Sequence, residues 1–164
     1  MSDYQEDISL HPYDPKDDPF LLTLYASTRQ DEMALVDWSP EEKEEFLRMQ
    51  FQAQKKSYQE QAPKATWQII TKSNLPIGRL IVEKRKHEIG LMDISILPKY
   101  RDQGIGTKLI KEVMDQAEQL QKPVRLYVEK DNKGAMRLYQ RLGFRLIGDT
   151  SMHHWMEWNP TKSY

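Results

Sequence analysis

The stretch ISILPKYRDQGIGTKLIKEVMDQ, from Ile94 to Gln116, carries the strongest fold signal in this sequence. An apolar run leads into two glycines one residue apart, Gly104 and Gly106, and an amphipathic helix follows. The first N–H groups of a helix have no partner inside it and carry partial positive charge, so such a turn can bind an anion. Glycine lets an anion approach the backbone and tolerates positive φ, and Thr107 adds a hydroxyl group. The pattern predicts either a phosphate cradle or an ordinary strand-to-helix turn.

Three known phosphate-binding loops can be compared with this turn. A P-loop requires G-x-x-x-x-G-K-[ST], but here the Thr of GIGTK precedes the Lys and no glycine stands at the required upstream distance. A Rossmann loop requires G-x-G-x-x-G/A, and Leu109 fills its third position. Only about 35 residues follow Glu129, too few for the second half of a dinucleotide-binding fold. The motif [RQ]-x-x-G-x-[GA] is matched at every fixed position by RDQGIG, from Arg101 to Gly106.

Hydrophobic periodicity and helix-capping signals predict the other elements. The clearest helix start is Ser39-Pro40-Glu41-Glu42, a capping box with proline at the first helical position. Together the patterns predict an α/β fold (an α+β mixed sheet) in the order β-α-α-β-β-β-α-β-α-β-β, with a central mixed sheet and helices on both faces, in one domain over residues 1–164. The predicted strands are 8–13, 66–71, 77–85, 88–97, 123–129, 144–150 and 153–158, and the predicted helices are 17–30, 40–61, 105–120 and 131–142.

Composition indicates which partners and which kinds of chemistry can be expected of this chain. The chain has 164 residues, of which 38% are hydrophobic and 30% charged, and a formal net charge of −1. This balance gives no reason to expect a nucleic-acid or membrane partner. The absence of cysteine excludes disulfides, thiolate metal sites and a cysteine nucleophile. The N-terminus resembles no signal peptide, so the expected location is cytoplasmic.

The region from Glu88 to Gly148 resembles the GNAT superfamily of acetyl-coenzyme A-dependent N-acetyltransferases. The match rests on RDQGIG, on the strand ending ILPKYR before it, on the helix after it, and on N-x-x-A-x-x-x-Y-x-x-x-G-F further on. This second motif contains Asn132, Tyr139 and Gly143. The resemblance implies that the protein binds acetyl-CoA and transfers its acetyl group to a small-molecule or protein amine by direct attack on the thioester.

The resemblance also implies roles for individual residues. The N–H groups from Gln103 through Thr107 are expected to hold the pyrophosphate of acetyl-CoA. Free backbone groups of Ile94 and Ile96 are expected to pair with the pantetheine arm as an added strand would, although both side chains also fit a buried strand face. Asn132 corresponds to a cofactor-contacting Asn, and it equally fits a helix cap. The cofactor-binding residues implied are Ile94, Ile96, Arg101, Gln103, Gly104, Ile105, Gly106, Thr107 and Asn132.

Tyr139 corresponds to the tyrosine that protonates the leaving thiolate as a general acid. A half-buried helix aromatic with a hydrogen-bonded hydroxyl is the alternative. The base that takes the amine proton is Asp93, Glu88 or ordered water. The two carboxylates fall on opposite faces of their strand because side chains alternate, and a structural salt bridge explains Asp93 equally well. No His or carboxylate spacing indicates a metal.

Acceptor specificity in this superfamily comes largely from the N-terminal helices and their connection, here residues 27–42. Asp31, Glu32, Asp37 and Trp38 could attract a cationic amine, or they could form a solvated acidic helix start beside one core tryptophan. Two other functions compete with the acetyltransferase: a catalytically silent acyl-CoA-binding regulatory domain of the same fold, and a nucleotide-binding oxidoreductase. The missing third glycine disfavours the oxidoreductase. The sequence leaves open whether the protein is a monomer or a homodimer.

Overall fold

The computed structural model describes residues 7–161 of the chain. The chain forms two compact units, Met1–Leu80 with Ile94–Arg101 and Ile81–Asp93 with Asp102–Tyr164. Strands β3 (Leu75–Lys84) and β4 (Ile89–Ile96) run through both units. Among the described residues, no helix is both long and apolar enough to cross a bilayer.

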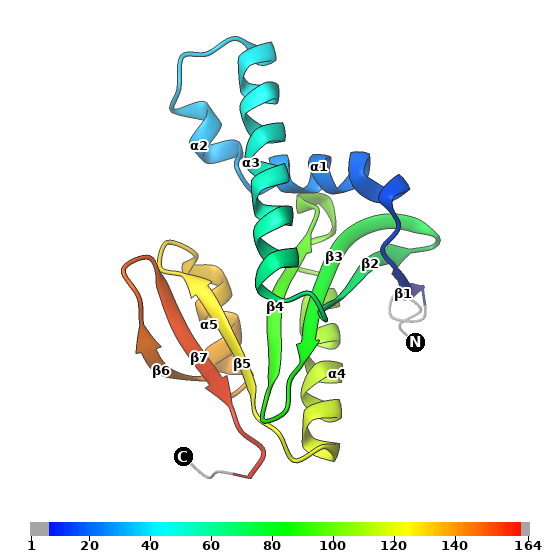
Figure 1. Cartoon of the computed structure of the whole chain (residues 1–164), viewed down its shortest axis with the longest axis vertical. Coiled ribbons are helices and arrows are strands. Elements are labelled where there is room, and N and C mark those ends of the chain that lie inside the picture. The colour runs from blue at the N-terminus through cyan, green and yellow to red at the C-terminus, as the bar shows by residue number, and fades with distance from the viewer. Residues whose placement is uncertain (1–6, 162–164) are drawn as a thin grey trace. The chain divides into compact units, whose positions relative to one another are not determined.

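The first unit contains the N-terminal elements in addition to its parts of β3 and β4 (Figure 1). They are β1 (Ile8–Pro12), η1 (Pro15–Asp17), α1 (Asp18–Ser27), α2 (Gln30–Ala34), α3 (Pro40–Gln61), β2 (Thr66–Lys72) and η2 (Pro98–Tyr100). The second unit contains α4 (Ile105–Gln119), β5 (Val124–Glu129), α5 (Lys133–Arg141), β6 (Arg145–Asp149) and β7 (His153–Trp158).

All seven strands form one sheet in the order β1-β2-β3-β4-β5-β7-β6. Strand β4 pairs in parallel with β5, whereas the β1–β2, β5–β7 and β6–β7 pairs are antiparallel. This mixed sheet and the element order confirm the predicted fold class. The structure adds one short helix, α2, that the sequence patterns did not predict.

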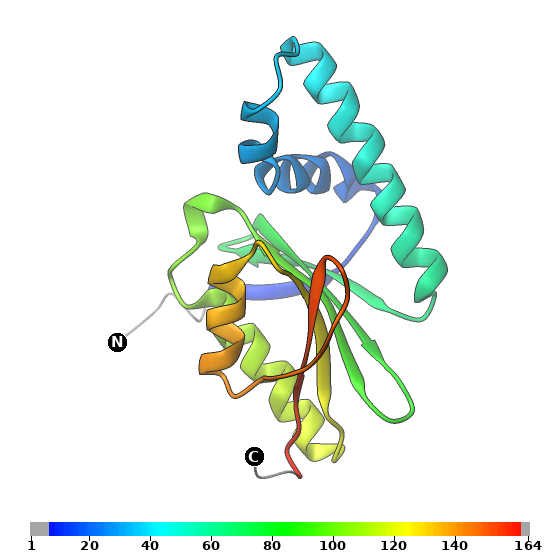
Figure 2. The same cartoon turned by 90° about the vertical axis from the view of Figure 1, so that its left-hand side faces the viewer.

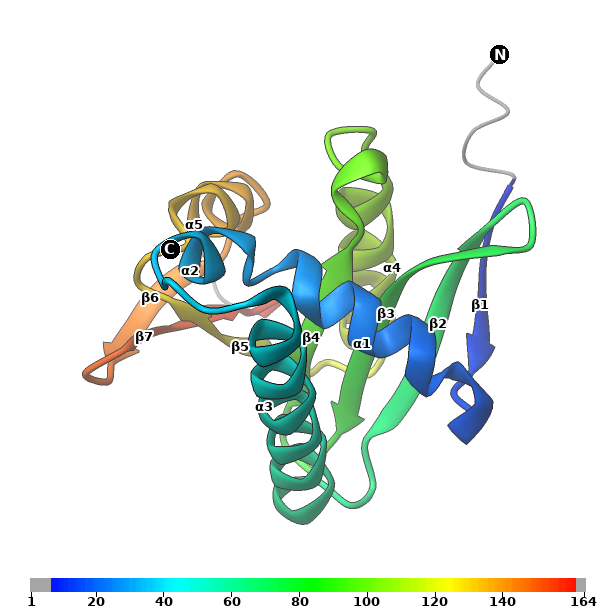
Figure 3. The ribbon, with the colours of Figure 1, turned by 90° about the horizontal axis from the view of Figure 1, so that it is seen from above.

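Helices α1 and α3 cover one face of β2 in the first unit (Figure 3). Their contact is a buried cluster of Leu21, Leu24, Tyr25, Phe51 and Ile69. The neighbouring Ile70 points to the opposite face of β2 and is also fully buried, so both faces of this strand are covered. Helix α3 begins with the predicted capping box, in which the Ser39 hydroxyl accepts from the Glu42 N–H and the Glu42 carboxylate accepts from the Ser39 N–H.

Helices α4 and α5 lie on the same face of the second unit (Figure 2). Strand β5 alternates between the buried Val124, Leu126 and Val128 and the more exposed residues between them. Five apolar side chains and one alanine of α4 complete this core: Ile105, Leu109, Ile110, Val113, Met114 and Ala117. One face of β5 is therefore packed, while the other presents Arg125 and Tyr127 at the sheet surface.

Candidate functional site

The amino-terminal end of α4 lacks a side-chain cap. Gly104 is the N-cap residue, with φ 80° and ψ 3°, and as a glycine it has no side chain to cap the first turn. The first helical hydrogen bond joins the Lys108 N–H to the Gly104 carbonyl at 3.0 Å. The N–H groups of Ile105, Gly106 and Thr107 precede it and so have no acceptor within the helix. By contrast, α3 and α5 are capped by Ser39 and Asn132. The start of α4 thus has the donors and the dipole of an anion site.

The loop leading to α4 keeps this end open. Asp102 and Gly104 both have positive φ, 61° and 80°. A Cβ built on Gly104 would meet no atom within 4 Å, so the space beside its backbone is accessible. Ile105 is buried and fixes the helix start against the core. The loop is therefore anchored by a side chain while it presents main-chain N–H groups.

Strand β4 becomes less buried as it runs toward this loop. Ile89, Gly90 and Leu91 are buried, whereas every residue from Met92 to Ile96 is half-buried. The described ladder between β4 and β5 has two pairs, Ile89 with Val124 and Gly90 with Arg125. Both strands continue past these pairs, so the described parallel ladder with β5 is confined to the start of β4.

Hydrogen bonds show that β4 contains one residue more than its partner β3 over the same distance. The Arg85 N–H donates to the Glu88 carbonyl near the hairpin, and the Leu97 N–H donates to the Ile77 carbonyl at the far end. Between these bonds β3 advances eight residues and β4 nine. Regular antiparallel pairing keeps equal spacing on both strands, so β4 contains a one-residue β-bulge.

The bulge determines which backbone groups of β4 face away from β3. The Leu97 N–H points to β3, and neighbouring residues of a strand point their backbone groups to opposite sides. With the extra residue before Ile94, this alternation directs the groups of Ile94 and Ile96 away from β3. The Ile96 carbonyl accepts from the Arg101 Nε at 2.8 Å, so Arg101 joins the start of the glycine loop to the end of β4.

Tyr139 lies on α5 with its ring against Phe144 at a centroid distance of 5.6 Å. Burial raises the pKa of the Tyr139 phenol well above its usual value, and the negative charge of Asp93 raises that pKa further. The phenol therefore keeps its proton at physiological pH and can act as a donor. The structure brings Tyr139 close enough to Asp93 for their charges to interact.

The two candidate bases have different surroundings. Asp93 is half-buried in β4 and acts on Tyr139 through its charge. Glu88 is held by two guanidinium groups, with Arg85 at 3.0 Å and Arg125 at 3.1 Å. These contacts give Glu88 a structural role and associate Asp93 with the tyrosine.

Asn132 caps α5, as its alternative reading predicted. Its Oδ1 accepts from the Ala135 N–H at 3.1 Å. This bond uses the carbonyl oxygen of the side chain and leaves the amide NH₂ as a donor group. Gly143 has φ 101° just after α5, in agreement with its predicted place at the helix end.

The expected acceptor region contains a shallow cavity of about 460 Å³. Trp38 packs edge-on against Phe46 at 5.0 Å and is 39% exposed, so the interpretation of Trp38 as a core residue was wrong. The lining residues are Trp38, Glu41, Glu42, Glu45, Phe46 and Met49. Aromatic faces beside carboxylates suit a cationic amine. Within residues 7–161 no group of three or more His, Asp and Glu side chains is placed to hold a metal ion.

Sequence reasoning missed Gly78 of β3, which affects the geometry of β4. A Cβ at this position would lie 2.3 Å from the Ser95 carbonyl oxygen. The glycine thus lets β3 and β4 approach each other closely at Ser95. Its sequence signal was a glycine inside an alternating strand, which is typical of a close backbone approach.

Comparison with known proteins identifies relatives of this chain. The model of the family described as "Acetyltransferase (GNAT) family" matches residues 26–144. Mouse thialysine N-epsilon-acetyltransferase is 50% identical over 56 residues, which is 32% of this chain and 32% of that relative. An uncharacterized N-acetyltransferase of Methanocaldococcus jannaschii is 39% identical over 64 residues, 38% of this chain and 28% of that relative. The alignments thus span about a third of these relatives' length.

A solved structure resembles the whole chain. The PaiA N-acetyltransferase of Thermoplasma acidophilum, solved in complex with coenzyme A, matches with a TM-score of 0.71 and 18% sequence identity. The match covers 97% of this chain and 99% of that one. At this identity the similarity establishes the fold.

Proposed function

Because this chain belongs to the acetyltransferase (GNAT) family, we propose that it transfers the acetyl group of acetyl-CoA to a primary amine. The membership confirms the family expected from RDQGIG and places the chain among acyltransferases. A primary amine as acceptor is consistent with the mouse relative, whose name specifies the ε-amine of thialysine.

The observation that carries this proposal is the uncapped start of α4. The N–H groups at this end of the helix, the positive φ of Gly104 and the open space beside that glycine suit the pyrophosphate of acetyl-CoA. Gln103, Gly104, Ile105, Gly106 and Thr107 would supply these donors. Arg101 would keep the loop in place through its bond to Ile96.

The pantetheine arm would pair with β4 as an additional strand. Ile94 and Ile96 would direct their backbone groups away from β3, and both residues lie beyond the two pairs of the β4–β5 ladder. The Ile94 N–H would then donate to the thioester carbonyl and stabilise the oxyanion that develops during attack. The Asn132 amide would add a donor to the cofactor.

The side chains of Tyr139 and Asp93 would carry out the two proton transfers, to the CoA thiolate and from the amine. The amine attacks the thioester carbon, the C–N bond forms, and the C–S bond breaks to release the CoA thiolate. Tyr139 would protonate this thiolate, since its raised pKa keeps the proton available. Asp93, directly or through water, would accept the proton lost by the amine. Its interaction with Tyr139 favours it over Glu88, which is engaged by two arginines.

Isothermal titration of the purified protein with acetyl-CoA, CoA and NAD tests the proposal. We expect saturable binding of acetyl-CoA and CoA and none of NAD. Gly104→Glu should abolish acetyl-CoA binding without unfolding the protein, because it places a carboxylate in an open anion site. Gly104→Ala is the matched control: it costs on the order of 1 kcal/mol of stability at positive φ and should reduce affinity far less. Normal binding by folded Gly104→Glu would contradict the assignment of the loop.

Turnover on a panel of amines separates an enzyme from a silent acyl-CoA-binding domain. Release of free CoA that depends on a primary amine would support acetyl transfer. Binding of acetyl-CoA with no turnover on any amine would favour the silent domain.

A further inference from the structure

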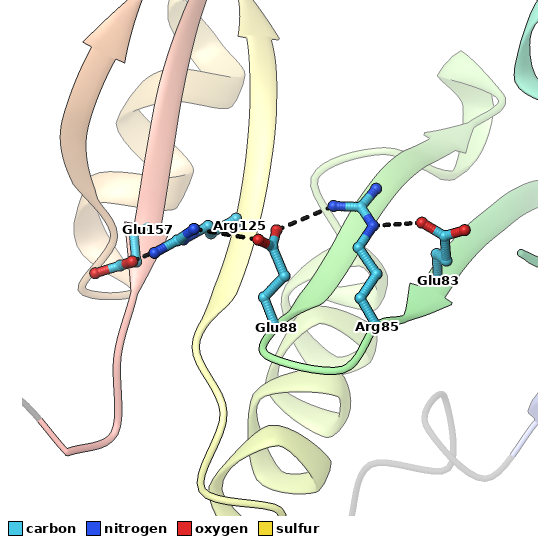
Figure 4. A network of polar contacts seen from close by, with 5 residues as sticks. All are labelled: Glu83, Arg85, Glu88, Arg125 and Glu157. Carbon is cyan, nitrogen blue, oxygen red and sulfur yellow. Dashed lines mark hydrogen bonds and ion pairs between the residues drawn. The ribbon is translucent and has the colours of Figure 1, made fainter. Parts of the chain in front are cut away.

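Five charged side chains form a continuous network across the second unit (Figure 4). The order along the network is Glu83, Arg85, Glu88, Arg125 and Glu157. Arg85 contacts Glu83, and its NH1 lies 3.0 Å from Glu88. On the other side, Arg125 NH1 lies 3.1 Å from Glu88 and Arg125 Nε lies 2.8 Å from Glu157. Glu88 is thus the carboxylate shared by both arginines.

The two arginines join different parts of the sheet. Both partners of Arg85, Glu83 and Glu88, lie within the β3–β4 hairpin. Arg125 lies on β5 and connects Glu88, at the start of β4, to Glu157 on β7. The Arg125–Glu88 pair is therefore the part of this network that links the two parallel strands.

This pair spans the short β4–β5 ladder, because Glu88 precedes its first pair, Ile89 with Val124, and Arg125 belongs to its last pair. The last ladder pair among the described residues is Gly90 with Arg125, so the residue that closes the ladder also holds the carboxylate of Glu88. Beyond it, β4 continues through Leu91 to Asp93, the residue whose charge acts on Tyr139. The ion pair thus bridges the paired part of the two strands, up to the residue at which their pairing ends.

The surroundings of Arg125 favour a well-defined contact. Glu157 is only 4% exposed at its side chain, and the guanidinium lies 5.6 Å from the centre of the Trp155 ring. Burial by itself would lower the pKa of Arg125, but its bonds to Glu157 and Glu88 outweigh burial and raise it. Arg125 is consequently a fixed cation that Glu157 and Trp155 orient toward Glu88.

We propose that the Arg125–Glu88 ion pair sets the point at which β4 and β5 separate and so positions the part of β4 that receives the pantetheine arm. Glu88 and Arg125 are positioning residues in this role, and they do not touch the reacting atoms. The inference rests on the proposed function, since it assigns the opening between these strands to acetyl-CoA.

The test compares Glu88→Ala with Arg85→Ala. Glu88→Ala removes the link to β5 and leaves Arg125 paired with the buried Glu157. Arg85→Ala is the matched control, because it removes charge from the same network and leaves the Arg125–Glu88 pair intact. Glu88→Gln preserves shape and one acceptor for Arg125, so it provides a second, milder variant should Glu88→Ala fold poorly.

Two measurements are made on the proteins without an amine acceptor, so that neither depends on proton transfer. Amide hydrogen exchange, followed by mass spectrometry, reports on the Ile89 N–H that bonds to the Pro123 carbonyl at 2.8 Å. We expect Glu88→Ala to accelerate this exchange by about tenfold and to weaken acetyl-CoA binding by about fivefold. Glu88→Gln should fall between Glu88→Ala and the unaltered protein, and Arg85→Ala should leave both quantities within about twofold.

The possible outcomes distinguish a failure of the ion-pair proposal from a failure of the proposed function. Unchanged exchange in Glu88→Ala, or equal effects of Glu88→Ala and Arg85→Ala, would overturn the proposal. Faster exchange with unchanged affinity would also overturn it, because the strand end would then have no influence on the ligand. If the unaltered protein does not bind acetyl-CoA, the proposed function fails instead and the positioning role fails with it.

Discussion

As the proposed general acid, Tyr139 has to meet two conditions at the scale of one residue: its phenol must be buried and must keep its proton. Burial and the charge of Asp93 act on its pKa in the same direction, so both conditions are met by the same surroundings. The motif predicted the tyrosine and its helix. It did not predict the interaction with Asp93 as the cause, because residues so far apart in the chain approach only after the sheet forms.

Tyr139→Phe should lower turnover by about a hundredfold, the usual contribution of a general acid, and change acetyl-CoA affinity little. Steady-state kinetics and isothermal titration measure the two effects separately. Tyr127→Phe is the matched control, because Tyr127 is 58% exposed on β5 and has no assigned role. Unchanged turnover in Tyr139→Phe would remove this residue from the mechanism.

The raised pKa of Tyr139 also predicts how stability depends on pH. The unfolded chain releases the phenolic proton near pH 10, whereas the folded protein retains it at higher pH. The stabilisation is complete below about pH 10 and is lost as the pH rises toward the folded-state value. Urea unfolding at about pH 8 and about pH 10.5 should therefore show a steeper alkaline loss of stability in the unaltered protein than in Tyr139→Phe. Equal losses in the two proteins would contradict the assigned pKa shift.

At the scale of elements, the sequence predicted the strands and the long helices, which have a periodic pattern. It missed the short helix α2 and the extra residue in β4, which have none. Periodicity and caps gave each strand and the long helices, and the Ser39 capping box marked the start of α3 within one residue. Helix α2 was missed because five residues are too few to show a helical period. The β4 bulge was missed because one extra residue leaves the apolar run from Ile89 to Leu97 unchanged in character.

Gly78→Ala tests the close approach of β3 and β4. The new methyl group would lie 2.3 Å from the Ser95 carbonyl oxygen, and backbone would have to move to accept it. We expect a loss of about 2 kcal/mol in the free energy of unfolding, measured by urea denaturation. Gly134→Ala is the matched control: a Cβ there meets no atom within 4 Å, and the substitution in α5 should stabilise the protein slightly. Equal effects of the two substitutions would mean that β3 and β4 do not require this contact.

At the scale of the whole molecule, we propose that the two compact units form one domain over residues 1–164. Strands β3 and β4 belong to both units, so neither unit has a complete sheet of its own. The sequence predicted one domain because no linker or change of composition interrupts it. The division into units depends on which residues contact each other in the folded chain, and composition alone does not predict those contacts.

Unfolding of the protein labelled with 5-fluorotryptophan tests this proposal. The four tryptophans divide evenly, with Trp38 and Trp67 in the first unit and Trp155 and Trp158 in the second. In a single domain, all four ¹⁹F signals should lose their native intensity at the same urea concentration, as expected for a two-state transition. Separate midpoints for the two pairs would show that the units unfold independently.

The extra residue in β4 makes this strand unusually sensitive to insertions and deletions. Removing one residue between Glu88 and Ile94 would give both strands eight residues between the same two hydrogen bonds, so β4 would lose its bulge while Leu97 still faced β3. The apolar character of the strand would survive, so the altered chain could still form the sheet, but β4 would lack the local bend and twist that a bulge introduces. Over evolutionary time, substitutions in β4 would be tolerated more readily than a change in its length by a single residue.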